Sequence, residues 1–166
     1  TSDHEIFLFA SSANVSQLTN NLVDDIHISS TRGFRLSGSA TPSGPFYTLA
    51  WETGLCAPLH CSVELKRYVH VWRNDPGGVS ESNIISSTSK LTQPSISGNG
   101  RYLALIDKST SSEHVKRYNF STKSFTTISN GSVFFNPSVS DDGLKLIYHN
   151  INPHFGFHAI TLYNSG

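Results

Sequence analysis

The sequence is poor in charge, cysteine and methionine. Only 14% of its 166 residues are charged, and 12 Lys and Arg balance 12 Asp and Glu, so the net charge is zero with His neutral. It therefore lacks the clustered cations that nucleic acids and anionic membranes attract, and we predict neither partner. No apolar run approaches the roughly 18 residues of a transmembrane helix. Methionine is missing even at position 1, so we expect a chain that has been processed or excised.

Four residues, among them Pro58, separate the two cysteines, Cys56 and Cys61. This spacing suits a small loop closed by a disulfide, and such a pair in a Ser- and Thr-rich, Lys-poor chain is typical of a secreted or periplasmic protein. Two reduced thiols in a cytosolic protein are the alternative. A zinc site built on the pair and His60 lacks further ligands, so we predict no metal and no cofactor.

Almost no segment has helical periodicity. Apolar residues come in short alternating runs separated by Asn-Gly, Asp-Gly and Pro-Gly turns, which is the pattern of an all-β chain. The clearest runs are Ile6–Phe9, Tyr68–Trp72, Tyr102–Ile106, Leu144–Tyr148 and Ile160–Tyr163.

A repeat organises these strands. The segment Pro94–Ile106 aligns with Pro137–Tyr148, and the two prolines lie 43 residues apart. A weaker copy starts at His27. Strands that end in an aromatic residue recur between these copies, and Leu-Thr or Ile-Ser pairs follow three of them. A unit of about 43 residues made only of strands suits a four-stranded propeller blade.

The repeat resembles that of the TolB-like β-propellers, which are relatives of the WD-repeat blade. The resemblance rests on a Pro, a Ser, an Asp-Gly turn and a Lys-x-Ile-x-aromatic-type strand, and Pro137–Tyr148 carries it best. Pro94–Ile106 has Asn99 in place of the Asp. The resemblance covers about two-thirds of the chain and implies a six-bladed ring in the family. It says little about activity.

We therefore predict a single all-β domain over residues 1–166, with about three to four propeller blades and an insertion at about 41–67. Three blades cannot close a ring, because propellers have at least four. The chain would form part of a homo-oligomeric ring or of a larger propeller. A β-sandwich or jelly roll is the alternative fold.

Several residues are candidates for structural or binding roles. Gly100, Asp142 and Gly143 are expected in equivalent hairpin turns. Aromatic and histidine side chains near turns or in the insertion are candidate binding residues, since exposed aromatic rings stack on sugars or anchor proteins. They are Trp51, Trp72, Tyr47, Phe155 and His154. The alternative is that the aromatic rings pack between blades.

No motif for a nucleophile elbow, a phosphate loop or a fixed pair of catalytic acids is present. The sequence therefore favours a non-catalytic binding or scaffold module of a secreted or periplasmic propeller, with a protein or peptide partner. The alternatives are a lectin-like carbohydrate-binding module and the propeller part of a hydrolase or lyase.

Overall fold

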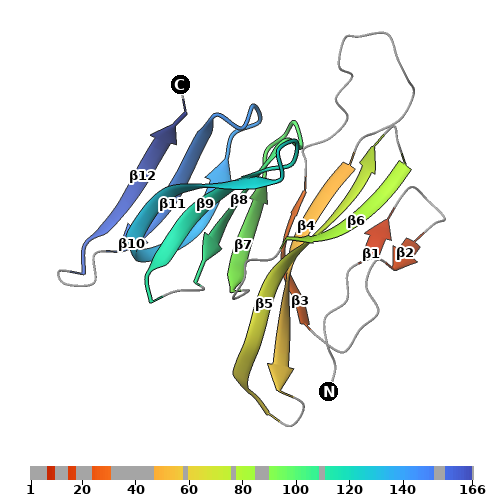
Figure 1. The fold of residues 1–166 in the computed structure, drawn as a ribbon, viewed down its shortest axis with the longest axis horizontal. Helices are drawn as coiled ribbons and strands as arrows, with labels where there is room; N and C mark the ends of the chain where they lie inside the picture. The colour runs from red at the N-terminus through yellow and green to blue at the C-terminus, as the bar shows by residue number, and fades with distance from the viewer. Residues whose placement is uncertain are drawn as a thin grey trace.

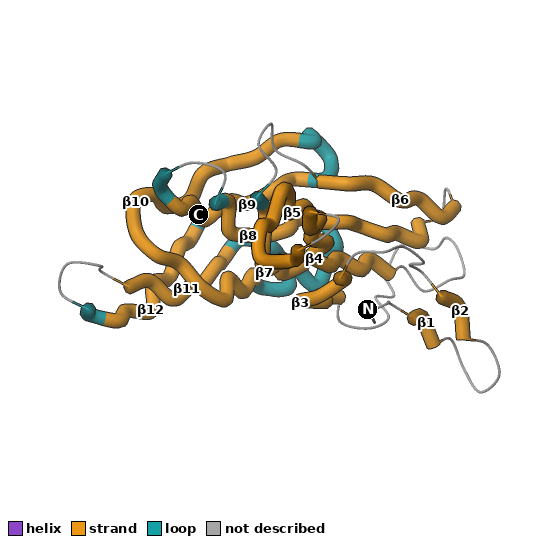
Figure 2. The backbone as a smooth tube through the Cα atoms, turned by 90° about the horizontal axis from the view of Figure 1, so that it is seen from below, coloured by secondary structure: helices purple, strands orange, loops and turns teal. Residues whose placement is uncertain are grey.

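A computed structural model gives the fold of the chain. It describes residues 7–9, 15–17, 24–30, 47–57, 60–75, 78–84, 90–108, 111–151 and 156–165. Side chains are described for residues 50–51, 68–71, 90–108, 111–129, 133–151 and 156–165. The described part consists of strands and their connecting turns (Figure 2).

The strands form three antiparallel sheets, each ordered as in the sequence (Figure 1). The first sheet pairs β1 (Phe7–Phe9) with β2 (Val15–Gln17). The second contains β3 (Asp24–Ser30), β4 (Tyr47–Ala57), β5 (His60–Asp75) and β6 (Gly78–Ile84). The third contains β7 (Leu91–Ile96), β8 (Tyr102–Asp107), β9 (Glu113–Asn119), β10 (Ser124–Val139), β11 (Lys145–Ile151) and β12 (His158–Asn164).

These strands are propeller blades. The first blade is β3–β6. The second blade is β7, β8, β9 and the part of β10 that pairs with β9, from Ser124 to Ser132. The third blade begins with the rest of β10, Val133–Val139, and continues through β11 and β12. The all-β propeller prediction is confirmed, and the β-sandwich alternative is wrong, since the strands form successive meanders along one arc.

A β-bulge recurs at one position in all three blades. The pairing of the first two strands shifts register between Ile26 and Ser29, between Thr92 and Ser95, and between Phe135 and Ser138. In the second and third blades the bulge contains Gln93 and Asn136, whose φ angles are 54° and 49°. A proline follows each of them, and a residue before proline is driven away from the right-handed helical region. The bulge bends the innermost strand of each blade.

The core lies between blades and repeats with the sequence. Leu91, Ile96, Leu103 and Leu105 of the second blade pack on Ala50, Val69 and Val71 of the first. The residues 43 positions later, Phe134, Val139, Leu146 and Tyr148, pack in the same way on Ala104, Ile106 and Val115 of the second blade. We call the surface that carries Leu91, Ile96, Leu103 and Leu105 in the second blade the leading face of a blade. The opposite surface, which carries Ala104, Ile106 and Val115 in the second blade, is its trailing face. Alternation along a strand places the two on opposite sides of a sheet.

The predicted insertion at 41–67 is strand rather than loop over most of its length. Residues 47–57 belong to β4, and residues 60–67 begin β5, which is 16 residues long against 7 for β9. The far ends of β4 and β5 extend beyond the other strands (Figure 1). The alternation of Cys61, Val63 and Leu65 with polar residues is itself a strand pattern.

Candidate functional site

The predicted binding residues are not gathered in one exposed site. Trp51 is fully buried and stacks on His70, with ring centroids 4.4 Å apart, so its ring packs inside the fold, which was the alternative to a binding role. Tyr47 and Trp72 lie within β4 and β5 rather than in loops, and their side chains are outside the described set. His154 and Phe155 lie outside the described residues.

Cys56 and Cys61 lie on the two strands of the β4–β5 hairpin, close to its end. Ala57 pairs with His60, and the register shifts on both sides of Cys56. The two sulfur atoms are outside the described set, so the disulfide stays a prediction.

Gly100 and Gly143 end two turns with the same hydrogen bonds. The amide of Gly100 donates to the carbonyl of Ser97, and the amide of Gly143 donates to that of Ser140. Asn99 and Asp142 each accept, through Oδ1, from the amide two residues later at 2.9 Å. The glycine φ angles are 66° and 79°, which explains why a residue without a Cβ stands there.

The Asp142 carboxyl is further bound by the hydroxyl of Ser140. The bonds from Ser140 and from the Leu144 amide lower its pKa below the ordinary value. Asp142 therefore has a structural role in its turn, where it is the charged counterpart of Asn99 in the second blade.

The two turns also contact each other across the blade boundary. The backbone amide of Asn99 donates to the carbonyl of Asp141, and its side-chain amide donates to that of Asp142, both at 2.9 Å. A Cβ on Gly143 would lie 2.1 Å from the ring of Tyr102. The turns are thus part of the contact between the second and third blades.

Arg117 of β9 extends this contact. Its guanidinium donates to the carbonyl of Gly143 at 3.1 Å and to the Ser165 hydroxyl at 3.0 Å. It also lies over the rings of Tyr102 and Tyr163, at 4.8 Å and 5.9 Å from their centroids. These contacts are those of a cation that holds two blades together.

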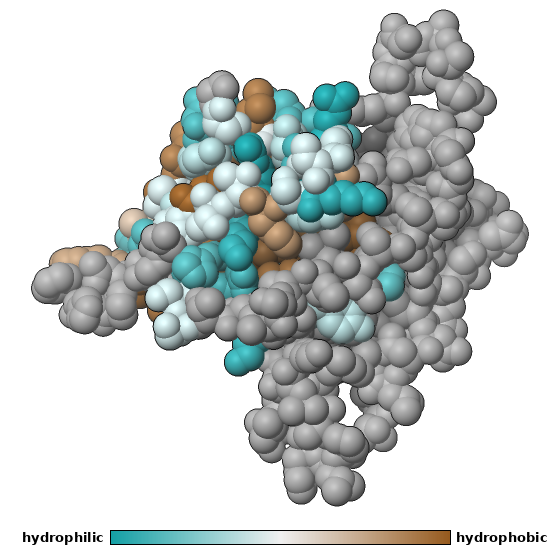
Figure 3. All heavy atoms as spheres, in the orientation of Figure 1, coloured by the Kyte–Doolittle hydropathy of each residue, from teal (hydrophilic) through white to brown (hydrophobic). Residues whose placement is uncertain are grey.

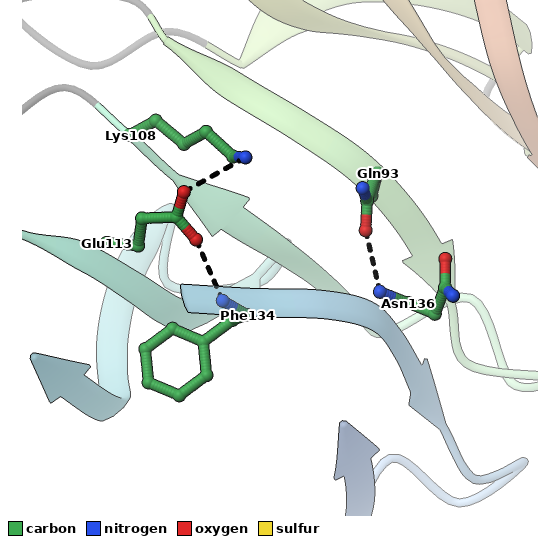
Figure 4. Close-up of polar contacts among 5 residues, drawn as sticks. All are labelled: Gln93, Lys108, Glu113, Phe134 and Asn136. Atoms are coloured by element: carbon green, nitrogen blue, oxygen red, sulfur yellow. Dashed lines mark hydrogen bonds and ion pairs between the residues drawn. The ribbon is translucent and has the colours of Figure 1, made fainter. Parts of the chain in front are cut away.

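Polar contacts join the same blades on the inner strands and at the opposite end (Figure 4). Glu113 accepts from the amide of Phe134 at 2.8 Å and pairs with Lys108 at 3.0 Å. Gln93 accepts from the amide of Asn136 at 2.6 Å, so one bulge binds the next. This polar cluster has structural partners throughout, and we assign it to blade packing.

The trailing face of the third blade is different, because it is open. We call Ile147, His149, Ile160 and Leu162 the terminal face. Strand register matches three of them to Ala104, Ile106 and Val115, which are all 0% exposed. In contrast Ile147 is 45%, Ile160 79% and Leu162 63% exposed. Hydrophobic side chains are visible along the β12 side of the molecule (Figure 3).

Two histidines lie together at the terminal face, His149 within it and His158 beside it. The rings of His149 and His158 stack with centroids 5.0 Å apart, and Nε2 of the first lies 2.9 Å from Nδ1 of the second. The ring of Phe135 lies 6.0 Å from that of His149. The terminal face is therefore an apolar surface with an aromatic and imidazole border, which suits recognition of a protein.

The described residues contain no cluster of three or more His, Cys, Asp or Glu that could hold a metal ion. Among the same residues, no helix is long and apolar enough to cross a membrane.

Known structures support the propeller assignment. No protein-family model and no curated protein matches the chain. It is similar to the β-propeller domain of the Trilobed protease from Pyrococcus furiosus, at TM-score 0.52 and 12% identity, over 71% of this chain and 36% of that one. It is also similar to TolB from Acinetobacter baumannii, at TM-score 0.50 and 17% identity, over 92% of this chain and 32% of that one. The chain thus spans about a third of the length of each, and the likeness shows the fold.

Proposed function

We propose that this chain is a non-catalytic, protein-binding module of a TolB-like propeller, located outside the cytoplasm, and that it binds its partner through the terminal face. One observation carries the proposal: a surface that is buried in both preceding blades is exposed in the third. Contiguous exposed apolar surfaces on soluble proteins usually mark interaction sites.

The partner has a defined chemistry. Both internal interfaces place four large apolar side chains of a β-sheet on a trailing face. We therefore expect the partner to present a sheet surface with large aliphatic or aromatic side chains in that arrangement. The first blade of a second copy fits poorly, because Trp51, which corresponds in register to Leu105, is already buried within its own chain.

The location outside the cytoplasm is supported by the placement of the two cysteines near one hairpin end and by the TolB-like repeat. A carbohydrate-binding role has less support, because Trp51 has no exposed ring surface.

The test is a light-scattering concentration series on the chain, Ile160→Asp and Thr126→Asp. Without its partner, the wild-type chain should associate through its apolar face, so its average mass should rise above 18.2 kDa with concentration. Ile160→Asp should remain at that mass, because the carboxylate cannot be buried in an apolar contact. Thr126 is exposed on the second blade, so Thr126→Asp should behave like wild type. Equal association in all three proteins, or a monomeric wild type at every concentration, would contradict the proposal.

A further inference from the structure

Two histidines of the third blade form a pair on neighbouring strands. His149 lies on β11 opposite Ile160 of β12, and His158 lies two residues before Ile160, on the same face of the sheet. Nε2 of His149 is 2.9 Å from Nδ1 of His158, and the two rings stack. The register of β11 with β12 alone sets this pair, so the pair does not depend on what lies beyond β12.

The repeat does not require histidine at these two positions. In the second blade the corresponding residues are Ile106 and Glu113. Ile106 is part of the apolar core, and Glu113 forms an ion pair with Lys108. The imidazole pair is therefore a feature of the third blade and not of blade packing in general.

Facing imidazole nitrogens are potential metal ligands. In the hydrogen bond between the rings, one nitrogen carries the proton and the other accepts it. A neutral imidazole can hold its proton on either ring nitrogen, so the donor ring can move the proton to its far nitrogen. Both facing nitrogens then present lone pairs, and neutral imidazole is the commonest protein ligand of transition metals.

The distance between the nitrogens favours one coordination geometry. Two nitrogens that are each about 2.0–2.1 Å from one ion and 2.9 Å from each other subtend an angle of about 90° at that ion. A tetrahedral Zn²⁺ centre needs about 109°. Neighbouring ligands at about 90° are those of a square-planar or tetragonal centre, which is the geometry of Cu²⁺ with nitrogen and oxygen ligands.

The surroundings hold the pair in place and leave room for water. Both rings stand on paired strands, which position side chains more precisely than loops do. The ring of Phe135, which is opposite His149 on β10, lies 6.0 Å from that imidazole. His158 is exposed and His149 is half-buried. The described residues add no third His, Cys, Asp or Glu to the pair, so water would fill the other coordination positions.

We infer that Nε2 of His149 and Nδ1 of His158 bind one Cu²⁺ ion. The inference goes beyond the proposed function, because the two ligands come from this chain and no partner is needed. It departs from the expectation of no metal, which rested on the cysteine pair. The sheet register brings together two ligands that are nine residues apart in the sequence.

The probe is Cu²⁺ alone, titrated into the chain and followed by calorimetry and electron paramagnetic resonance. We expect one strong site per chain, with an axial spectrum and nitrogen coupling from two imidazoles. His149→Gln and His158→Gln should each bind Cu²⁺ at least about tenfold more weakly, because a single imidazole cannot chelate the ion.

The matched control is Lys145→Gln, which changes an exposed side chain of β11 and leaves both imidazoles, so it should bind like wild type. If His149→Gln does not fold, the exposed His158 still provides a variant that decides the question. Equal binding in wild type and in both histidine variants would mean an adventitious ion only and would overturn the inference. A spectrum with fewer than two imidazoles would also overturn it. Failure of the proposed function is read separately, from the mass of Ile160→Asp.

Discussion

At the scale of single residues, the repeat is visible in the turns of the second and third blades, which have the same hydrogen bonds. Ser97 and Ser140 accept, through their hydroxyls, from the amides five residues later, both at 3.0 Å. Each turn then ends in a glycine with positive φ. Identical bonds 43 residues apart mean that substitutions in one turn can be compared directly with those in the other.

Gly143→Ala should destabilise the fold by roughly 2–4 kcal/mol, because it combines left-handed strain with a forced shift of the Tyr102 ring. Gly156 is the control. Its φ is also positive, at 64°, but nothing lies within 4 Å of a Cβ built there. Gly156→Ala should therefore cost only the strain, about 1–2 kcal/mol. Denaturant midpoints measure both, and equal costs would argue against the contact with Tyr102.

Asp142 gives the turn of the third blade a pH dependence that Asn99 cannot give the second. Its pKa is lowered from the ordinary 3.8 by the bonds from Ser140 and Leu144. The carboxylate therefore stabilises the folded state above that value, and the contribution is lost as the pH falls through the lower folded-state pKa.

Asp142→Asn should thus be less stable than wild type at neutral pH, and the difference should shrink as the pH falls below about 4. Denaturant midpoints across pH 2–7 follow this. Asp141→Asn removes a charge from the same turn but neither of these two bonds. A difference between wild type and Asp142→Asn that stays constant down to pH 2 would rule out this role for the carboxylate.

At the scale of elements, β9 is the strand that joins blades. It faces the third blade with Arg117 and Glu113. On its other side Lys116 pairs with the buried Asp107 of β8 at 2.6 Å. Burial of Asp107 is tolerated because the Lys116 ammonium pairs with its carboxylate and donates a hydrogen bond to it. The strand can therefore carry charge in a sheet that is covered on both faces.

The sequence predicted the strands, turns and repeat well, because those depend on local patterns. The bulges at Gln93 and Asn136 were not predicted, because a residue before proline is expected mainly in an extended conformation, whereas these two have positive φ. Trp51 is a candidate binding residue in the sequence because its neighbours suggest an insertion, yet they form a long hairpin. The polar contacts of Glu113 with Phe134 also lacked a signal, because they join strands of different blades.

At the scale of the whole molecule, burial is decided by neighbouring blades rather than by the strand itself. Alternation in β12 predicts that Ile160 faces a core, just as Val115 does in β9. Ile160 and Val115 occupy the same position of the repeat. Val115 alone is covered, because the third blade packs on it. The site could therefore not be found from hydrophobic periodicity alone, which gives both residues the same assignment.

Substitutions of Val115 and Ile160 test whether the terminal face is open or is covered by another part of the chain. Val115→Ala should destabilise the isolated chain by about 1–3 kcal/mol, because it leaves a cavity between the second and third blades. Ile160→Ala should change stability by less than about 0.5 kcal/mol, because a residue that is 79% exposed loses few contacts. Chemical denaturation of the two variants at one protein concentration, low enough to keep the chain monomeric, measures both.

A loss of stability in Ile160→Ala equal to that in Val115→Ala would mean that another part of the chain covers this face in solution. In that case the third blade would have no surface left for a partner. If the cost at Ile160 instead appears only as the protein concentration is raised, the contact is intermolecular, because only then does association contribute to the free energy of unfolding.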